Sequence, residues 1–145
     1  MLILLLSACL ADSDCQVTAT NIVQIALKRT DKDTVAQVKF SLITVSGTES
    51  TFQKSDTVTS LQIPVNPKSS ETTFRFTYAS KASPTPKTDT VTLSYVSKNI
   101  IVSPACGGFF YYSELAVIAT SFPNIPKVVN SQLSTGATKN LEIKL

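Results

Sequence analysis

Apolar and polar residues alternate along most of this chain, and this period of two limits the possible fold more than any other feature. Successive residues of a β-strand point to opposite faces, so each alternating run predicts a strand with one buried face. The apolar positions of the six clearest runs are Val23/Ile25/Leu27, Ala36/Val38/Phe40/Leu42, Leu61/Ile63/Val65, Phe74/Phe76/Tyr78, Val91/Leu93/Tyr95 and Leu141/Ile143/Leu145. No amphipathic helix pattern longer than about two turns interrupts the series, so the chain is predicted to be all-β.

Three irregularities in this pattern predict where strands bend or end. The alternation changes phase at Leu42 and Ile43, which predicts a β-bulge or a strand end. Pro64 lies within an apolar run, and because proline has no N–H to donate, that strand is expected to end there or to lie at a sheet edge. Lys81–Lys87 holds two prolines and predicts a long connection.

About seven to eight strands, spaced by roughly 8–15 residues, are expected in one domain. Each strand has one apolar face, so two antiparallel sheets must pack face to face to bury these faces. With 145 residues, 43% of them apolar, the chain is long enough to form such a core. The predicted fold is an immunoglobulin-like antiparallel β-sandwich, and a small β-barrel is the alternative. The chain has no Trp, so the disulfide-and-tryptophan core of antibody domains is not expected.

The charged residues exclude several classes of function. The chain has 13 Lys and Arg against 10 Asp and Glu, a net charge of +3, and its longest basic run is Lys28-Arg29. Such a weak and scattered positive charge does not predict a nucleic-acid groove. The absence of His removes the commonest general base and the commonest zinc ligand. We therefore expect no enzyme activity, no cofactor, no metal and no nucleic-acid partner.

The first eight residues differ from the rest of the chain in hydropathy. The mean hydropathy of the chain is +0.16. The hydropathy values of Met1–Ala8 alone add up to about the same total as those of the whole chain, so the remaining residues average close to zero. This apolar stretch leads into Leu6-Ser7-Ala8-Cys9, which resembles the lipobox of bacterial lipoprotein signal peptides. The resemblance implies cleavage before Cys9, acylation of the Cys9 thiol and anchoring in a lipid bilayer. It divides the chain into a signal peptide (1–8), a lipidated tether (9–14) and a β-sandwich domain (15–145).

The N-terminus departs from the signal-peptide pattern in one respect. No positively charged residue precedes the apolar stretch, which is also short. We interpret this as a start site that lies upstream of Met1; the alternative is an N-terminal strand with a chance cysteine. No Asp follows Cys9 directly, where inner-membrane retention signals often lie. The resemblance therefore favours an outer-membrane lipoprotein that faces either the periplasm or the cell surface.

Three cysteines are an odd number for an exported protein. If Cys9 carries lipid, Cys15 and Cys106 remain, and an oxidising compartment would join them in a disulfide. Such a bridge closes a loop of 92 residues (106 − 15 + 1), for which chain entropy gives about 4–5 kcal/mol. Two buried free thiols are the alternative. Two distant cysteines without histidine make a poor metal site.

The order of these features resembles a family of uncharacterised small bacterial lipoproteins. The shared features are a cysteine soon after the lipobox, Asp89-Thr90 before a strand that contains Tyr95, the segment Ser103-Pro104-Ala105-Cys106-Gly107, and a C-terminal strand of alternating apolar residues. The resemblance covers nearly the whole mature chain. It implies an association with predicted outer-membrane barrels, and it implies no activity and no site residue.

Phe109-Phe110-Tyr111-Tyr112 places aromatic rings on both faces of one predicted strand. One face is expected to fill the core. The other is a candidate binding surface for a glycan or a protein partner, with Tyr111 and Tyr112 as its residues, because aromatic side chains dominate interface energetics.

Three other candidate sites each have a structural explanation. Cys106-Gly107-Gly108 is a candidate anion-binding nest, but two glycines after a bridged cysteine also permit a sharp turn. Asp31 and Asp33 have the spacing seen in calcium loops but lack the further ligands, so an Asx turn is expected. Glu114 is an acid within an apolar stretch, and it is expected to be exposed on a strand rather than catalytic.

Together these observations favour a membrane-anchored, non-catalytic binding or accessory module that works with an outer-membrane protein. It would act through loops at one end of the sandwich, or through a strand edge offered for pairing. A carbohydrate-binding or adhesive surface module is the alternative.

Overall fold

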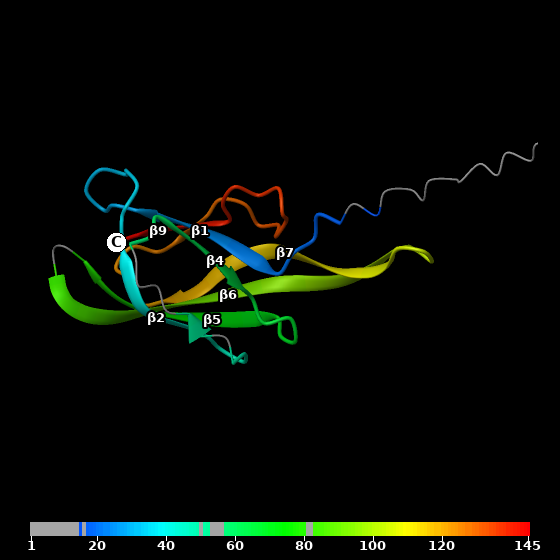
Figure 1. The fold of residues 1–145 in the computed structure, drawn as a ribbon, viewed down its shortest axis with the longest axis horizontal. Helices are drawn as coiled ribbons and strands as arrows, with labels where there is room; N and C mark the ends of the chain where they lie inside the picture. The colour runs from blue at the N-terminus through cyan, green and yellow to red at the C-terminus, as the bar shows by residue number, and fades with distance from the viewer. Residues whose placement is uncertain (1–14, 16, 50, 53–56, 81–82) are drawn as a thin grey trace, which may run out of the picture.

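The computed structural model describes residues 15, 17–49, 51–52, 57–80 and 83–145, which form a two-layer β-sandwich (Figure 1). Nine strands lie in two sheets that pack against each other. In these residue ranges, no helix is long and apolar enough to cross a membrane. The predicted signal peptide (1–8) and tether (9–14) lie outside the described residues.

The first sheet has four strands, in the order β4 (Ser60–Pro64), β1 (Ile22–Lys28), β9 (Leu141–Lys144) and β8 (Lys127–Val128). β1 runs antiparallel to β4 and parallel to β9. The parallel pair departs from the predicted all-antiparallel arrangement. Parallel neighbours need a crossover connection, and here the strands of the second sheet lie within that connection.

The second sheet has five strands, in the order β3 (Thr51–Phe52), β2 (Lys39–Val45), β5 (Glu71–Ser80), β6 (Ser83–Ser103) and β7 (Gly107–Thr120). All of its strand pairs are antiparallel. β6 and β7, with 21 and 14 residues, form a hairpin that runs along the molecule in Figure 1. The two sheets do not close on each other, so the sandwich prediction is confirmed and the barrel alternative is wrong.

One cluster of buried apolar side chains fills the space between the sheets, as the alternating runs predict. The second sheet contributes most of the aromatic rings, which pack at tilted angles, with Phe40 and Phe76 centroids 5.8 Å apart. Aliphatic side chains of the first sheet cover them. The largest fully buried side chains are Tyr78, Phe40, Phe74, Phe76, Ile25, Leu27, Ile43, Ile63, Leu93, Leu133, Leu141 and Ile143.

Two of the predicted irregularities are confirmed. The pairing of β2 with β5 shifts register between Phe40 and Leu42, and after this bulge Ile43 and Val45 become the buried residues. β4 ends at Pro64 and lies at the edge of the first sheet. An edge strand has a neighbour on one side only, so the N–H that proline lacks is not needed to pair with a further strand.

The long connection predicted over Lys81–Lys87 is wrong from Ser83 onward, and its first two residues lie outside the described ranges. β6 already begins at Ser83, and it pairs with β7 only from Val91 onward. The first part of β6 therefore has an open side. Pro84 and Pro86 lie in this part, and a sheet edge is where a strand tolerates proline.

Candidate functional site

The structure brings Cys15 and Cys106 together at disulfide distance, as predicted. Their Cα atoms lie 5.7 Å apart, within the usual disulfide range of about 4.4–6.8 Å. Cys106 lies in the turn that joins β6 to β7, so the bridge attaches the segment before β1 to the end of this hairpin. Cys9, the predicted lipidation site, lies outside the described residues.

The two glycines after Cys106 have structural roles in the hairpin turn. Gly107 has a φ of 73°, a left-handed conformation that glycine adopts without strain. A Cβ on Gly108 would lie 2.8 Å from Asn99 Oδ1, so glycine permits a close approach there. These constraints match the sharp-turn explanation of the segment.

Glu114 is exposed, as expected, and it has a φ of 57°. It lies where the register of β6 and β7 shifts, between the pairs Ser94–Ala116 and Val96–Ser113. Its unusual conformation is therefore part of a bulge in β7.

Tyr111 and Tyr112 do not form one binding surface. Tyr112 is 3% exposed, and its ring meets Tyr95 edge-on with the centroids 5.8 Å apart. Neighbouring residues alternate between faces, so Tyr111 lies on the other face and is half-buried. The expectation that Tyr112 is a surface residue is therefore wrong, because its ring packs in the core; a β-bridge to Leu133 places the C-terminal segment beside it. The exposed aromatic side chain of this strand is Phe110.

Asp31 and Asp33 lie in the turn after β1, and each carboxylate is paired with a cation. Arg29 donates two hydrogen bonds to Asp31, at 2.9 and 2.8 Å, and Lys144 Nζ lies 3.1 Å from Asp33 Oδ1. The hydrogen bond from Arg29 lowers the pKa of Asp31, and the one from Lys144 lowers the pKa of Asp33. Across the described ranges, no three potential ligands among Cys, Asp and Glu are grouped to hold a metal ion.

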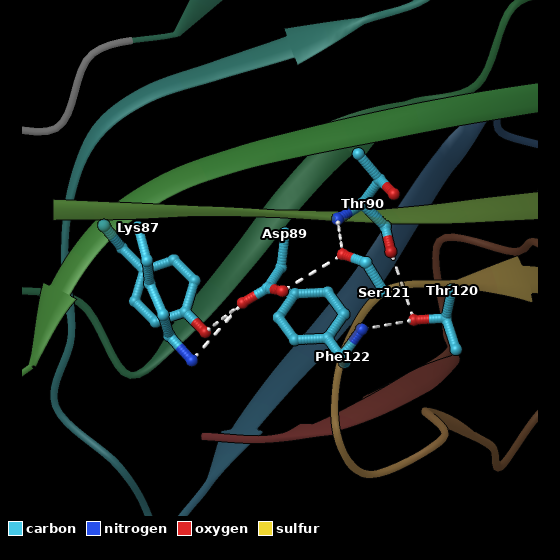
Figure 2. A network of polar contacts seen from close by, with 7 residues as sticks. Lys87, Asp89, Thr90, Thr120, Ser121 and Phe122 are labelled. Carbon is cyan, nitrogen blue, oxygen red and sulfur yellow. Dashed lines mark hydrogen bonds and ion pairs between the residues drawn. The ribbon is translucent and has the colours of Figure 1, made fainter.

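A polar cluster that the sequence analysis did not identify as a site surrounds Asp89, which is only 8% exposed (Figure 2). Tyr78 Oη donates to Asp89 Oδ2 at 2.8 Å, and Ser121 Oγ donates to Oδ1 at 3.0 Å. Lys87 Nζ lies 3.4 Å from Oδ2 and also 5.0 Å from the centre of the Tyr78 ring. Both carboxylate oxygens therefore have partners, and a cation neutralises the charge.

The cluster continues into the backbone around Ser121 (Figure 2). Ser121 Oγ accepts a hydrogen bond from the Thr90 N–H at 2.8 Å, and the Ser121 N–H donates to the Thr90 carbonyl at 3.0 Å. Thr120 Oγ1 donates to the same carbonyl at 3.1 Å. The Phe122 ring then stacks on Tyr78, with the centroids 6.4 Å apart. Asp89 thus joins β5, β6 and the chain that follows β7.

Asp89 occupies a core-facing position of β6, and this place in the alternating pattern is the signal that could have identified it. It precedes Val91, Leu93 and Tyr95 by steps of two, and all four side chains are buried. A carboxylate at an inward position needs partners from neighbouring strands. Tyr78, at an inward position of β5, is one such partner.

Tyr78 predicts a loss of stability at alkaline pH. Burial first, then the hydrogen bond to Asp89 and its charge, raise the pKa of Tyr78. An unfolded tyrosine ionises near pH 10, whereas folded Tyr78 keeps its proton. The contribution of Tyr78 to the free energy of unfolding is therefore fully present below about pH 10. Above that pH it falls by about 1.4 kcal/mol per pH unit.

Urea unfolding at a series of pH values should show this decline, and the decline should be shallower for Tyr78→Phe, because phenylalanine does not titrate. Equal slopes for the two proteins above about pH 10 would contradict this role of Tyr78.

The other buried polar side chains also hold the fold together. Asn140 Oδ1 accepts from the Gln24 N–H at 3.0 Å, and Asn140 Nδ2 donates to the Gln132 carbonyl at 2.8 Å. Thr72 Oγ1 lies 2.7 Å from Tyr95 Oη, which donates to the Asn66 carbonyl at 2.6 Å. In the described part of the chain, no buried side-chain nitrogen or oxygen lacks a hydrogen-bond partner.

A pocket of about 360 Å³ lies between the β2–β3 edge of one sheet and β4 of the other. Its described lining combines apolar and polar residues and carries no charged side chain: Ile43, Phe52, Ser60, Leu61, Gln62 and Ile63. This lining offers shape and the polar groups of Ser60 and Gln62, but no acid–base group.

The fold and its polar clusters define a small all-β sandwich domain with a cysteine bridge from its N-terminal segment to a long hairpin. Residues 39–144 match a protein family described as a family of unknown function (DUF6452), and the chain belongs to this family. The match runs from β2 to β9 and confirms the expected membership in an uncharacterised family. Comparisons with curated proteins and with solved structures find no significant match.

Proposed function

We propose that this chain is a bacterial outer-membrane lipoprotein, cleaved before Cys9 and held in the bilayer by acyl chains on the Cys9 thiol. Its β-sandwich acts as a non-catalytic binding or accessory module for an outer-membrane partner. The body of the protein lies outside the cytosol, in an oxidising compartment.

The pairing of the cysteines is the observation that carries the proposal. Cys15 and Cys106 lie at disulfide distance, so Cys9 is left as the odd cysteine of three. It follows Leu6-Ser7-Ala8, the residue types of a lipobox. A disulfide is also typical of exported proteins rather than of cytosolic ones. Both features favour the same compartment.

The polar clusters support a binding role rather than catalysis. The oxygens of Asp89 bind Tyr78, Ser121 and Lys87, so the carboxylate is engaged in holding strands together. A nucleophilic serine needs an adjacent base to remove its proton, and the chain has no His to supply one. The proposed module therefore acts through its surface.

Cys9→Ser is expected to abolish acyl labelling and to move the protein from the membrane fraction to the soluble fraction. Each buried CH₂ of an acyl chain contributes about 0.8 kcal/mol, and one chain alone gives only marginal binding, so two or three chains account for a stable anchor. The measurement is labelling with a radioactive or clickable fatty acid, followed by fractionation of the cells.

Cys15→Ser is the matched control for this experiment, because it replaces a cysteine in the same part of the chain, at the cost of the bridge to Cys106, and leaves Cys9 intact. It should keep the acyl label and the membrane fraction. Unchanged partitioning of Cys9→Ser would overturn the proposed anchor.

The accessory role is tested by crosslinking in intact cells followed by mass spectrometry of the purified protein. We expect one outer-membrane protein to be recovered with the wild-type chain and to be lost with Cys9→Ser, which no longer resides at the membrane. Recovery of no partner from native membranes would contradict the accessory role.

A further inference from the structure

Residues 96–113 of the hairpin of β6 and β7 form an arm: its base, with Tyr112, packs in the core, and its end extends beyond the sandwich. β6 has 21 residues, whereas β1 in the facing sheet has seven. The arm therefore continues past the end of the facing sheet, toward the right in Figure 1. Its strands remain paired from Val96–Ser113 to Ser103–Gly107, so it is an ordered extension of the second sheet.

Exposed apolar side chains gather on this arm. Cross-strand partners share one face of a hairpin, so the pair Asn99–Phe110 places Phe110 on the same face as Ile101, two residues from Asn99. Ile101 is 76% exposed and Phe110 is 56% exposed. The other face holds Ile100. The exposed large apolar residues of the arm are Val96, Ile100, Ile101, Val102 and Phe110.

The arm also has almost no charge. Residues 99–113 include no Asp, Glu, Lys or Arg, and Lys98 is the one charged residue of the arm. Exposed apolar side chains gathered at one end of a molecule mark a site of contact with another molecule or with a membrane. Lys98 lies at the base of the apolar part, where an ammonium group would meet lipid headgroups.

The cysteine bridge determines where this surface lies. Cys106 is in the turn at the end of the arm and is joined to Cys15. Cys15 follows Cys9 by six residues, which span at most about 20–22 Å even when fully extended. A lipid on Cys9 would therefore hold the end of the arm close to the bilayer surface.

We propose that the end of this arm, with Ile100, Ile101, Val102 and Phe110, inserts into the headgroup region of the bilayer that holds the acylated Cys9. This inference rests on the proposed function, because the lipid anchor brings the arm to the membrane. The depth is limited, because β7 is the edge strand of its sheet and the hydrocarbon core cannot satisfy the free N–H and C=O groups of a strand edge. The arm thereby fixes the orientation of the sandwich, which a flexible tether alone would leave free.

Single-tryptophan variants test this contact, because the chain has no Trp of its own. Ile101→Trp reports on the end of the arm. Ile125→Trp is the matched control, because Ile125 is 78% exposed and lies beyond Thr120, at the other end of β7. The 14 residues of β7 span about 45 Å, and the two probes lie toward opposite ends of this strand. Equal exposure means that any intrinsic preference of tryptophan for membranes acts on both variants.

Each full-length variant is expressed in a bacterial host, purified from the membrane and reconstituted into vesicles of phosphatidylethanolamine and phosphatidylglycerol, with or without brominated acyl chains. We expect the emission of Trp at position 101 to shift to the blue and to be strongly quenched by the brominated lipids. Trp at position 125 should emit as in water and resist quenching.

Acyl labelling of the same preparations separates this inference from the proposed function. Labelled protein that floats with the vesicles but shows no more quenching at position 101 than at position 125 would overturn the arm contact and leave the anchor intact. Unlabelled protein that fails to float would overturn the anchor, and the arm contact with it.

Discussion

Replacing Asp89 with alanine is expected to destabilise the sandwich by about 1–3 kcal/mol, because the buried Tyr78 hydroxyl loses its acceptor and an unsatisfied buried group costs about that much. Tyr78 Oη lies 2.8 Å from the carboxylate, whereas Ser121 Oγ, at 3.0 Å, belongs to an exposed residue that water can reach. Lys87 also loses its ion-pair partner. Urea unfolding at neutral pH measures the change in the free energy of unfolding.

A double-mutant cycle identifies the cause of this loss. Tyr78→Phe removes the donor, so the combined variant Tyr78→Phe/Asp89→Ala should lose less stability than the sum of the single variants, by about 1–3 kcal/mol. Asp31→Ala is the control for a general effect of removing a carboxylate, because its ion pair with Arg29 is exposed to solvent and contributes little. Wild-type stability in Asp89→Ala would contradict the structural role of the cluster.

Replacing both Cys15 and Cys106 with serine is expected to lower the free energy of unfolding by about 2–5 kcal/mol. The bridge closes a loop that includes β1 to β6, so its loss lets the unfolded chain expand and gain entropy. The folded segment near Cys15 has other contacts, since the Thr135 N–H donates to the Thr18 carbonyl at 2.8 Å. The fold itself should therefore survive the substitution, and only its stability should fall.

Thermal and urea unfolding of this double variant, which retains Cys9, measure the effect. Reduction of the wild-type protein should reproduce it, while Cys9→Ser should leave stability unchanged. Equal mobility of reduced and non-reduced wild-type protein on a gel, with both thiols open to alkylation in the native state, would contradict the bridge.

The alternation of the sequence predicted much of the core, because packing follows directly from side-chain direction in a strand. Val23, Ile25 and Leu27 are all buried, as are Phe74 and Phe76. The bulge in β2 and the edge position of β4 were also predictable, because each depends on a few neighbouring residues. A change in the alternation marks the bulge, and a proline marks the edge strand.

Features that depend on distant parts of the chain were not predictable in the same way. The parallel pairing of β1 with β9 depends on the path of all intervening strands. The continuous length of β6 depends on β7, which pairs with it as far as Ser103. The role of Asp89 depends on Ser121, 32 residues later in the chain. The burial of Tyr112 likewise depends on Tyr95 of the neighbouring strand, against which its ring packs.

The most direct test of the account is intact mass spectrometry of the wild-type protein purified from the membranes of a bacterial host. We predict a chain that begins at Cys9, carries the mass of a diacylglycerol group on that residue and contains one disulfide. A protein recovered from the cytosol with an unacylated chain that still includes Met1–Ala8 would contradict the account.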